Sequence, residues 1–110
     1  MTTRALSLAL DDIETLGASW MPQLENGGLF MPTRDAFHLG QRVYLLLSLP
    51  GEQERRPVSG VVAWVSPVGM TGRRTPGIGI HLDAEEQPLR VRIEALLTEA
   101  PPDTMRSYTL

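Results

Sequence analysis

Short apolar runs separated by glycine, proline and polar residues follow one another as far as Leu82, a pattern typical of β-strands joined by turns. The runs that predict strands lie at residues 5–10, 28–32, 42–49, 58–68 and 77–82. The third is almost entirely apolar, so we expect both of its faces to be covered. In the last, Ile78, Ile80 and Leu82 alternate with other residues and should face inward, whereas His81 should face outward.

The fourth run, "VSGVVAWVSPV", also follows the two-residue period of a strand. Simple alternation places Val61 and Val65 on one face and Val62 and Trp64 on the other. Gly60 within this run indicates a bulge or a bend in the strand.

Helical signals occur at two places. Asp11 or Asp12 can cap one short helical turn, which we expect Gly17 and Pro22 to stop. Near the other end of the chain, apolar residues recur every three or four positions from Leu89 to Ala100, which predicts an amphipathic helix.

The start of this second helix has two competing signals. Asp83 and Glu86 have the spacing of a capping box, while Pro88 suits a first helical turn. Both signals cannot define the same helix end. The pair Pro101-Pro102 should end the helix.

Several antiparallel strands followed by one helix predict a mostly β protein with a C-terminal α-helix, arranged as a small antiparallel β-barrel. We expect residues 1–100 to form one domain and residues 101–110 to be a flexible tail. The apolar stripe of the helix would close one opening of the barrel or shield an edge strand.

Composition narrows the possible functions. The chain has 110 residues and a formal net charge of −3, so it has no bulk attraction for nucleic acid or anionic membranes. It has no cysteine, which excludes disulfides and thiolate chemistry. No apolar run approaches the ~20 residues needed to span a bilayer, so we expect a cytoplasmic protein without direct membrane insertion.

Catalytic motifs are missing from the sequence. Ser59 does not lie in a G-x-S-x-G elbow, and two histidines, His38 and His81, are too few for a typical zinc site. The sequence therefore predicts no catalytic residue, no metal site and no cofactor. Two alternatives stay open: a small hydrolase that uses Ser59 or His81, and a phosphate clamp formed by Arg73 and Arg74.

The two tryptophans have two interpretations each: they fill the core, or they are displayed as anchors for a partner protein. Trp20 lies in the irregular segment "ASWMP", and Trp64 lies late in a predicted strand. The pair Gly27-Gly28 is similarly open. It can be a tight turn into the following strand, or a place where the backbone approaches a phosphate or a partner.

Taken together, "GGLFMPT", "LGQRVYLLLSLP", "VSGVVAWVSPVG", "GIGIHL" and the final helix resemble the PilZ domain family, from about Leu6 to Leu97. More narrowly, "SLAL", "NGGLF", "GIGI" and the V-x-W around Trp64 resemble family members that serve type IV pilus biogenesis. The resemblance implies a small β-barrel and a non-catalytic role.

The family is best known for binding cyclic di-GMP through R-x-x-x-R and D-x-S-x-x-G motifs. Gly28 matches the last position of the second motif, but Gln23 and Glu25 stand at its Asp and Ser positions. In the first motif, Arg4 is followed four residues later by Leu8. The resemblance thus implies a protein that does not bind cyclic di-GMP itself. A direct cyclic-dinucleotide receptor is the alternative.

The resemblance also implies two partners, the type IV pilus extension ATPase and an EAL-domain protein that binds cyclic di-GMP. Residues with apolar or aromatic side chains near the expected contacts are the predicted partner-binding residues: Trp20, Met21, Pro22, Trp64, Met105, Tyr108 and Leu110. The last three lie in the tail, which is either a frayed terminus or a segment that orders on a partner.

Overall fold

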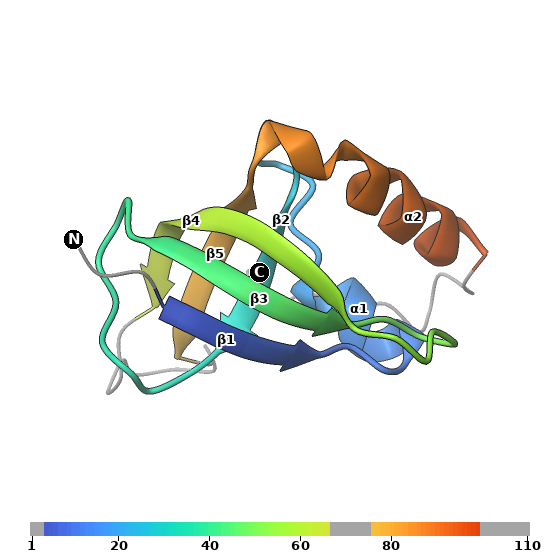
Figure 1. Ribbon diagram of the computed structural model, residues 1–110, viewed down its shortest axis with the longest axis horizontal. Coiled ribbons are helices and arrows are strands. Elements are labelled where there is room, and N and C mark those ends of the chain that lie inside the picture. Colours follow the sequence, from blue (N-terminus) through green and yellow to red (C-terminus); the bar gives the residue numbers. More distant parts are fainter. Residues whose placement is uncertain (1–3, 67–75, 100–110) are drawn as a thin grey trace.

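A computed structural model describes residues 4–66 and 76–99 of the protein. Its elements, in chain order, are β1 (Arg4–Ala9), α1 (Ile13–Ser19), β2 (Gly28–Pro32), β3 (Arg42–Ser48), β4 (Arg56–Ser66), β5 (Gly77–Leu82), the 3₁₀ turn η1 (Ala84–Glu86) and α2 (Gln87–Thr98). The five strands form one sheet, and the two helices lie together beside one end of it (Figure 1). The expected mostly β fold with a C-terminal helix is confirmed.

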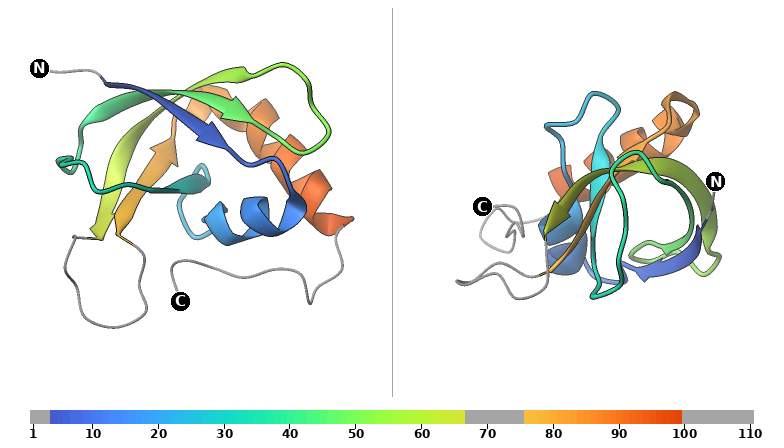
Figure 2. Two further views of the ribbon diagram at one scale, coloured as in Figure 1. Left: turned by 90° about the horizontal axis from the view of Figure 1, so that it is seen from below. Right: turned by 90° about the vertical axis from the view of Figure 1, so that its left-hand side faces the viewer.

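The sheet has the strand order β1-β3-β4-β5-β2 and curls into a half-barrel. The right-hand view of Figure 2 shows this curl. The pairs β3–β4, β4–β5 and β5–β2 are antiparallel. The pair β1–β3 is parallel, so the expectation of an entirely antiparallel sheet is wrong at this edge. The chain between these two strands passes through α1 and β2, and this long crossover lets β3 run in the same direction as β1.

The core fills the concave side of the half-barrel. Leu45, Ile80 and Leu29 come from three different strands and are almost completely buried there. Leu89 and Ile93 of α2 belong to the same buried cluster, which explains why this helix shows apolar residues at helical spacing. The predicted amphipathic helix is confirmed, and its apolar stripe packs against the core contributed by the sheet.

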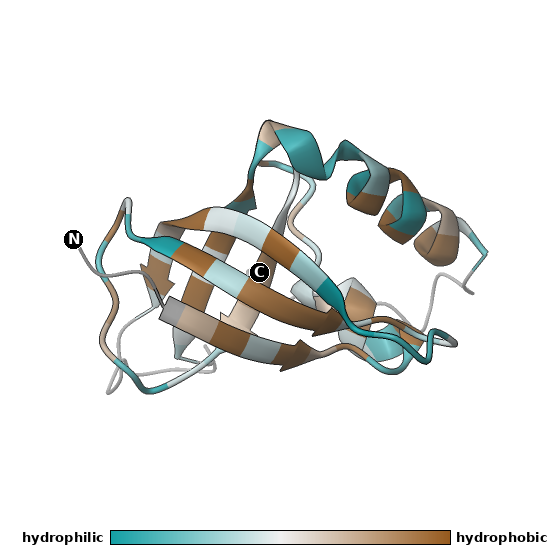
Figure 3. Ribbon diagram, in the orientation of Figure 1, coloured by the Kyte–Doolittle hydropathy of each residue, from teal (hydrophilic) through white to brown (hydrophobic). Residues whose placement is uncertain are grey.

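The outer face of β3 differs from the prediction. Leu45 and its inward neighbours are buried, but Tyr44 and Leu46 are 48% and 46% exposed. Figure 3 shows the nearly continuous hydrophobic colouring of β3 that suggested two covered faces. The expectation was wrong because only the inner face of β3 is covered by other parts of the protein. The sequence alone does not distinguish an apolar residue on the exposed outer face from one in the core.

The observed helix boundaries confirm some of the predicted start and stop signals and contradict others. Asp12 is the N-cap of α1, and its Oδ1 accepts a hydrogen bond of 2.8 Å from the Thr15 N–H. Gly17 lies inside α1 rather than ending it, because one glycine costs a helix only about 1 kcal/mol. At the second helix Pro88 occupies the first turn, as predicted.

The predicted capping box of Asp83 and Glu86 is wrong. Neither carboxylate caps a helix end, because each has a partner far away in sequence. Asp83 accepts a 2.7 Å hydrogen bond from Arg42 Nη1, and Glu86 accepts one of 2.9 Å from the Ser59 N–H. These contacts tie the turn before α2 to strands β3 and β4.

A bulge in β4 changes which of its residues share a face. The register shifts between Val62 and Trp64, so that Val62 pairs with Ile80 but Trp64 pairs with Gly79. Val62 and Val65 therefore both face the core. Trp64 faces outward, so the sequence assignment of Val62 and Trp64 to one face is wrong. The bulge that Gly60 suggested exists, a few residues further along the strand.

A candidate partner-binding site around Trp64

Two glycines on the outer face of β5 make room for large side chains from its neighbours. Gly77 and Gly79 alternate with the buried isoleucines of this strand. A Cβ on Gly79 would lie 3.0 Å from Met21 Sδ and 3.2 Å from Trp64 Cβ, and one on Gly77 would lie 2.6 Å from Phe30 Cζ. The glycines therefore leave a shallow strip that Met21, Phe30 and Trp64 fill.

Phe30 and Trp64 meet across this strip. Both residues are in register with Gly79, Phe30 from β2 and Trp64 from β4. Their ring centroids are 5.6 Å apart and the ring planes are tilted by 48°, a favourable arrangement for two aromatic rings. Phe30 is completely buried, whereas Trp64 is only partly buried. Phe30 thus supports a tryptophan that keeps part of its indole at the surface.

An apolar pocket lies beside the exposed part of this indole. It has a volume of about 280 Å³ and is lined by Met21, Gln23, Leu24 and Trp64. We call it the outer pocket. Its lining combines one aromatic side chain, two aliphatic side chains and one neutral amide, so it suits an apolar group rather than an anion.

The glycine pair at the start of β2 positions Trp20 and its neighbour Met21, which lines the outer pocket. Gly27 has φ of +80°, and the indole of Trp20 packs directly on its Cα, so that a Cβ at this position would overlap the ring. The Met21 N–H donates a 2.8 Å hydrogen bond to the Gly28 carbonyl. The pair therefore serves the backbone, as a tight turn and a close packing surface for Trp20.

Two side chains fix the turn that carries Gln23 and Leu24. His81 Nε2 accepts a hydrogen bond of 3.2 Å from the Asn26 N–H. Arg90 Nη1 of α2 donates a 2.8 Å hydrogen bond to the Glu25 carbonyl. The turn is thus attached both to the sheet and to α2.

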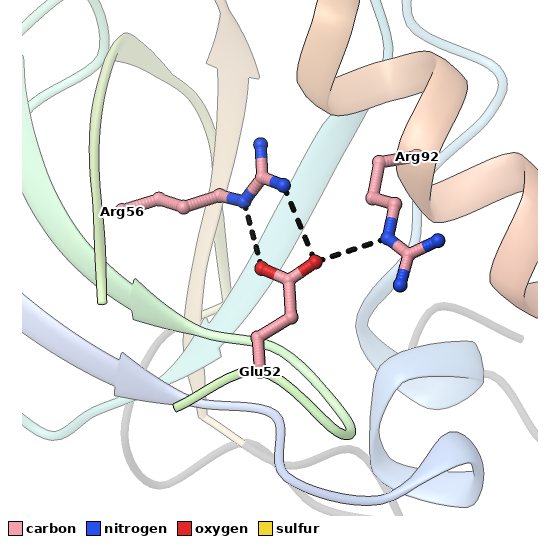
Figure 4. Close-up of polar contacts among 3 residues, drawn as sticks. All are labelled: Glu52, Arg56 and Arg92. Carbon is pink, nitrogen blue, oxygen red and sulfur yellow. Dashed lines mark hydrogen bonds and ion pairs between the residues drawn. The ribbon is translucent and has the colours of Figure 1, made fainter. Parts of the chain in front are cut away.

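Charged residues join α2 to the β3–β4 hairpin on another side of the molecule. Figure 4 shows the Glu52 carboxylate between two guanidinium groups, with Arg56 Nε at 2.9 Å and Arg92 Nε at 3.0 Å. Hydrogen bonds from Arg56 lower the pKa of Glu52, and the hydrogen bond from Arg42 likewise lowers the pKa of Asp83. Arg92 lies forty residues from Glu52, so sequence spacing could not reveal this contact.

The residues considered for catalysis have other partners. Ser59 donates from its N–H and from Oγ to Glu86 Oε2, at 2.9 and 3.3 Å, so its hydroxyl bonds to a carboxylate and not to a histidine base. His81 bonds to the backbone of Asn26. Within residues 4–66 and 76–99, no group of three histidine or acidic side chains could hold a metal ion. In the same ranges, neither helix has the length and apolar character that a membrane span requires.

Comparison with known protein families gives one match, the PilZ domain, over residues 14–99. The chain belongs to the PilZ domain family. Members of this family are receptors or adaptors connected with cyclic di-GMP, and the family is generally one of binding domains and not of catalysts. The comparison with curated proteins found no match.

Within this PilZ domain, the predicted partner-binding residues have different environments. Trp20 and Met21 are buried, with 7% and 3% exposure, while Pro22 is exposed and Trp64 partly exposed. Of the two interpretations of Trp20, the structure supports core filling, because its ring lies on Gly27 and in the main cluster. Met21 and Trp64 meet at the outer pocket, and partner binding there stays a prediction.

The remaining predicted residues lie outside the described ranges: Met105, Tyr108, Leu110, Arg73 and Arg74. Among the positions of the PilZ ligand motifs, Gln23 and Glu25 are exposed, whereas Leu8 is buried in the core. Sequence reasoning missed the pocket residue Leu24. The only sequence signal for it was its place just before the glycine pair, on the turn that leads into β2.

Proposed function

We propose that this PilZ domain is a non-catalytic, cytoplasmic adaptor for type IV pilus biogenesis and twitching motility. In this role it links the pilus extension ATPase to an EAL-domain protein that binds cyclic di-GMP, and does not bind the nucleotide itself. One observation carries the proposal: the outer pocket presents an apolar surface beside a partly exposed Trp64.

The physical basis is the role of tryptophan in protein interfaces. A supported indole contributes a large apolar area with little loss of conformational freedom on binding, so it is enriched among residues that dominate binding energy. Trp64 is supported by Phe30 and adjoins a pocket that a partner's side chain can enter. We assign this surface to the ATPase and the tail to the EAL-domain protein.

The positions of the ligand motifs favour an adaptor over a receptor. Cyclic di-GMP carries two phosphates, which proteins usually bind with arginine forks. Leu8 provides an aliphatic side chain in the core, and exposed Glu25 adds a negative charge where the family motif has a serine. These residues would leave the phosphates without the usual cations from this part of the site.

The ATPase assignment is tested with Trp64→Ala. Loss of a central tryptophan anchor should weaken binding to the purified ATPase by about 2 kcal/mol, or roughly thirtyfold. Tyr44→Ala is the matched control, because Tyr44 is an exposed aromatic residue on the outer face of β3 and away from the outer pocket. Circular dichroism and thermal unfolding establish that both variants are folded. Wild-type affinity in folded Trp64→Ala would refute the assignment.

The nucleotide part is tested by isothermal titration with cyclic di-GMP. We expect no saturable heat at a dissociation constant below ~10 μM, which corresponds to about −7 kcal/mol. Saturable binding in that range would instead make the protein a direct cyclic-dinucleotide receptor.

A further inference from the structure

The outer pocket is an apolar recess on a small protein, and such a recess is normally covered by an apolar group when one is available. We propose that the C-terminal segment of this same chain, residues 100–110, occupies the outer pocket and masks Trp64 when no partner protein holds that segment. This inference goes beyond the proposed function. Only the effect on ATPase binding, described at the end of this subsection, rests on the proposed function.

The position of α2 brings the segment to the right part of the molecule. Helix α2 contacts α1, and α1 leads through Trp20 directly to Met21, which lines the outer pocket. The chain leaves α2 after Thr98, with Glu99 as its C-cap. Eleven residues follow Glu99. Extended, they reach roughly 35 Å, comparable with the longest dimension of the protein, 36 Å.

The composition of the segment fits the pocket. It contains three large apolar or aromatic residues, Met105, Tyr108 and Leu110, spaced among small and polar ones. Methionine and leucine side chains match a pocket of about 280 Å³ lined by Met21, Leu24 and Trp64. Proline is disfavoured inside a helix, so from the pair Pro101-Pro102 we expect the segment not to continue α2.

The expected strength of the contact follows from its being intramolecular. One or two apolar side chains in a shallow pocket bind with a dissociation constant on the order of 1 mM. A short tether supplies an effective concentration of several millimolar, so the segment occupies the pocket in most molecules. Any protein that requires the free pocket then binds about three- to tenfold more weakly than it binds a chain without the segment.

The masking is measured through Trp64 itself, without a partner protein. The chain has only two tryptophans, and Trp20 is 7% exposed, so quenching of tryptophan fluorescence by acrylamide reports mainly on Trp64. We compare the full chain with a variant in which the three large tail residues become serine: Met105→Ser, Tyr108→Ser and Leu110→Ser. The matched control replaces three polar tail residues: Thr104→Ala, Ser107→Ala and Thr109→Ala.

We expect the serine variant to be quenched at least twofold more strongly than the full chain, and the alanine control to behave as the full chain. A peptide of residues 100–110, added at millimolar concentration, should restore protection to the serine variant. Equal quenching of all three proteins overturns the proposal. Protection that increases with protein concentration also overturns it, because the segment would then occupy a second copy.

The consequence for an adaptor is a coupling between its two partners. If the EAL-domain protein withdraws the segment, it frees the outer pocket and should raise the affinity for the ATPase by the same three- to tenfold factor, and the reverse effect must be equal. If the segment protects Trp64 from acrylamide but does not change the affinity for the ATPase, the masking of the outer pocket still holds. The ATPase assignment in the proposed function would then be the part that fails.

Discussion

Gly27 supports Trp20, and replacing it with alanine tests how closely the turn before β2 packs against this ring. Two penalties arise. Alanine is strained at φ of +80°, and its Cβ would overlap the benzo ring of Trp20, a buried residue of the main core. The chain provides a control for the first penalty alone: Gly51 has φ of +75°, and a Cβ added there would meet no atom within 4 Å.

The magnitudes separate the two penalties. A left-handed backbone costs an L-residue about 1–2 kcal/mol, and alanine regains part of this, about 0.4–1 kcal/mol, by restricting the unfolded chain. Gly51→Ala should therefore lower the free energy of unfolding by about 1 kcal/mol. Overlap in a packed core adds about 1–3 kcal/mol, so Gly27→Ala should lower it by about 3 kcal/mol.

Urea unfolding followed by circular dichroism measures both free energies. The expected difference of about 2 kcal/mol corresponds to roughly 10 °C in Tm for a domain of this size. In a Trp20→Phe background the overlapping ring atoms are gone, and the cost of Gly27→Ala should fall toward that of Gly51→Ala. Equal costs of the two alanine variants in the wild-type background would refute the packing of Trp20 on Gly27.

Two further predictions concern charge and the outer face of the sheet. Because their arginine partners lower the folded-state pKa values of Glu52 and Asp83, these carboxylates stabilise the fold above their ordinary pKa range, and the contribution is lost as the pH falls from about 5 toward 2. The double variant Glu52→Gln, Asp83→Asn should therefore lose less stability over that pH interval than the wild type. The midpoints of urea unfolding at each pH measure these losses, and equal losses in the two proteins would contradict the prediction. On β3, Leu45→Ala should cost about 3 kcal/mol and Leu46→Ala no more than about 0.5 kcal/mol, and similar costs would argue against the exposed outer face.

Local sequence patterns predicted those parts of the fold that depend on local structure. The alternation of Ile78, Ile80 and Leu82 identified the inner face of β5, and the spacing of Leu89 and Ile93 identified the buried side of α2. These predictions succeeded because side-chain direction repeats with the period of the element, and burial on one side imposes that period on the sequence.

The features that sequence did not reveal depend on contacts between distant residues. The bulge in β4 moves Trp64 to the face opposite Val62, and nothing in "VVAWV" marks the extra residue. Asp83 had the spacing of a capping residue, but its partner is Arg42 on another strand. The candidate site has the same character, since Met21 and Trp64 become neighbours only when β5 brings Gly79 between them.

Strand order also affects how this protein folds. Strands β3, β4 and β5 pair in succession along the chain, so their contacts close short loops. Strands β1 and β2 form the two edges, and their pairings, such as Leu6 with Leu45 and Leu29 with Ile80, join residues far apart in sequence. Closing long loops costs more entropy, which favours early formation of the central three strands and late docking of the edges. Substitutions that weaken only an edge should then mainly accelerate unfolding, and those in the central strands should slow folding. Because β2 carries Phe30, the support beneath Trp64 would be completed in the last steps of folding and lost in the first steps of unfolding.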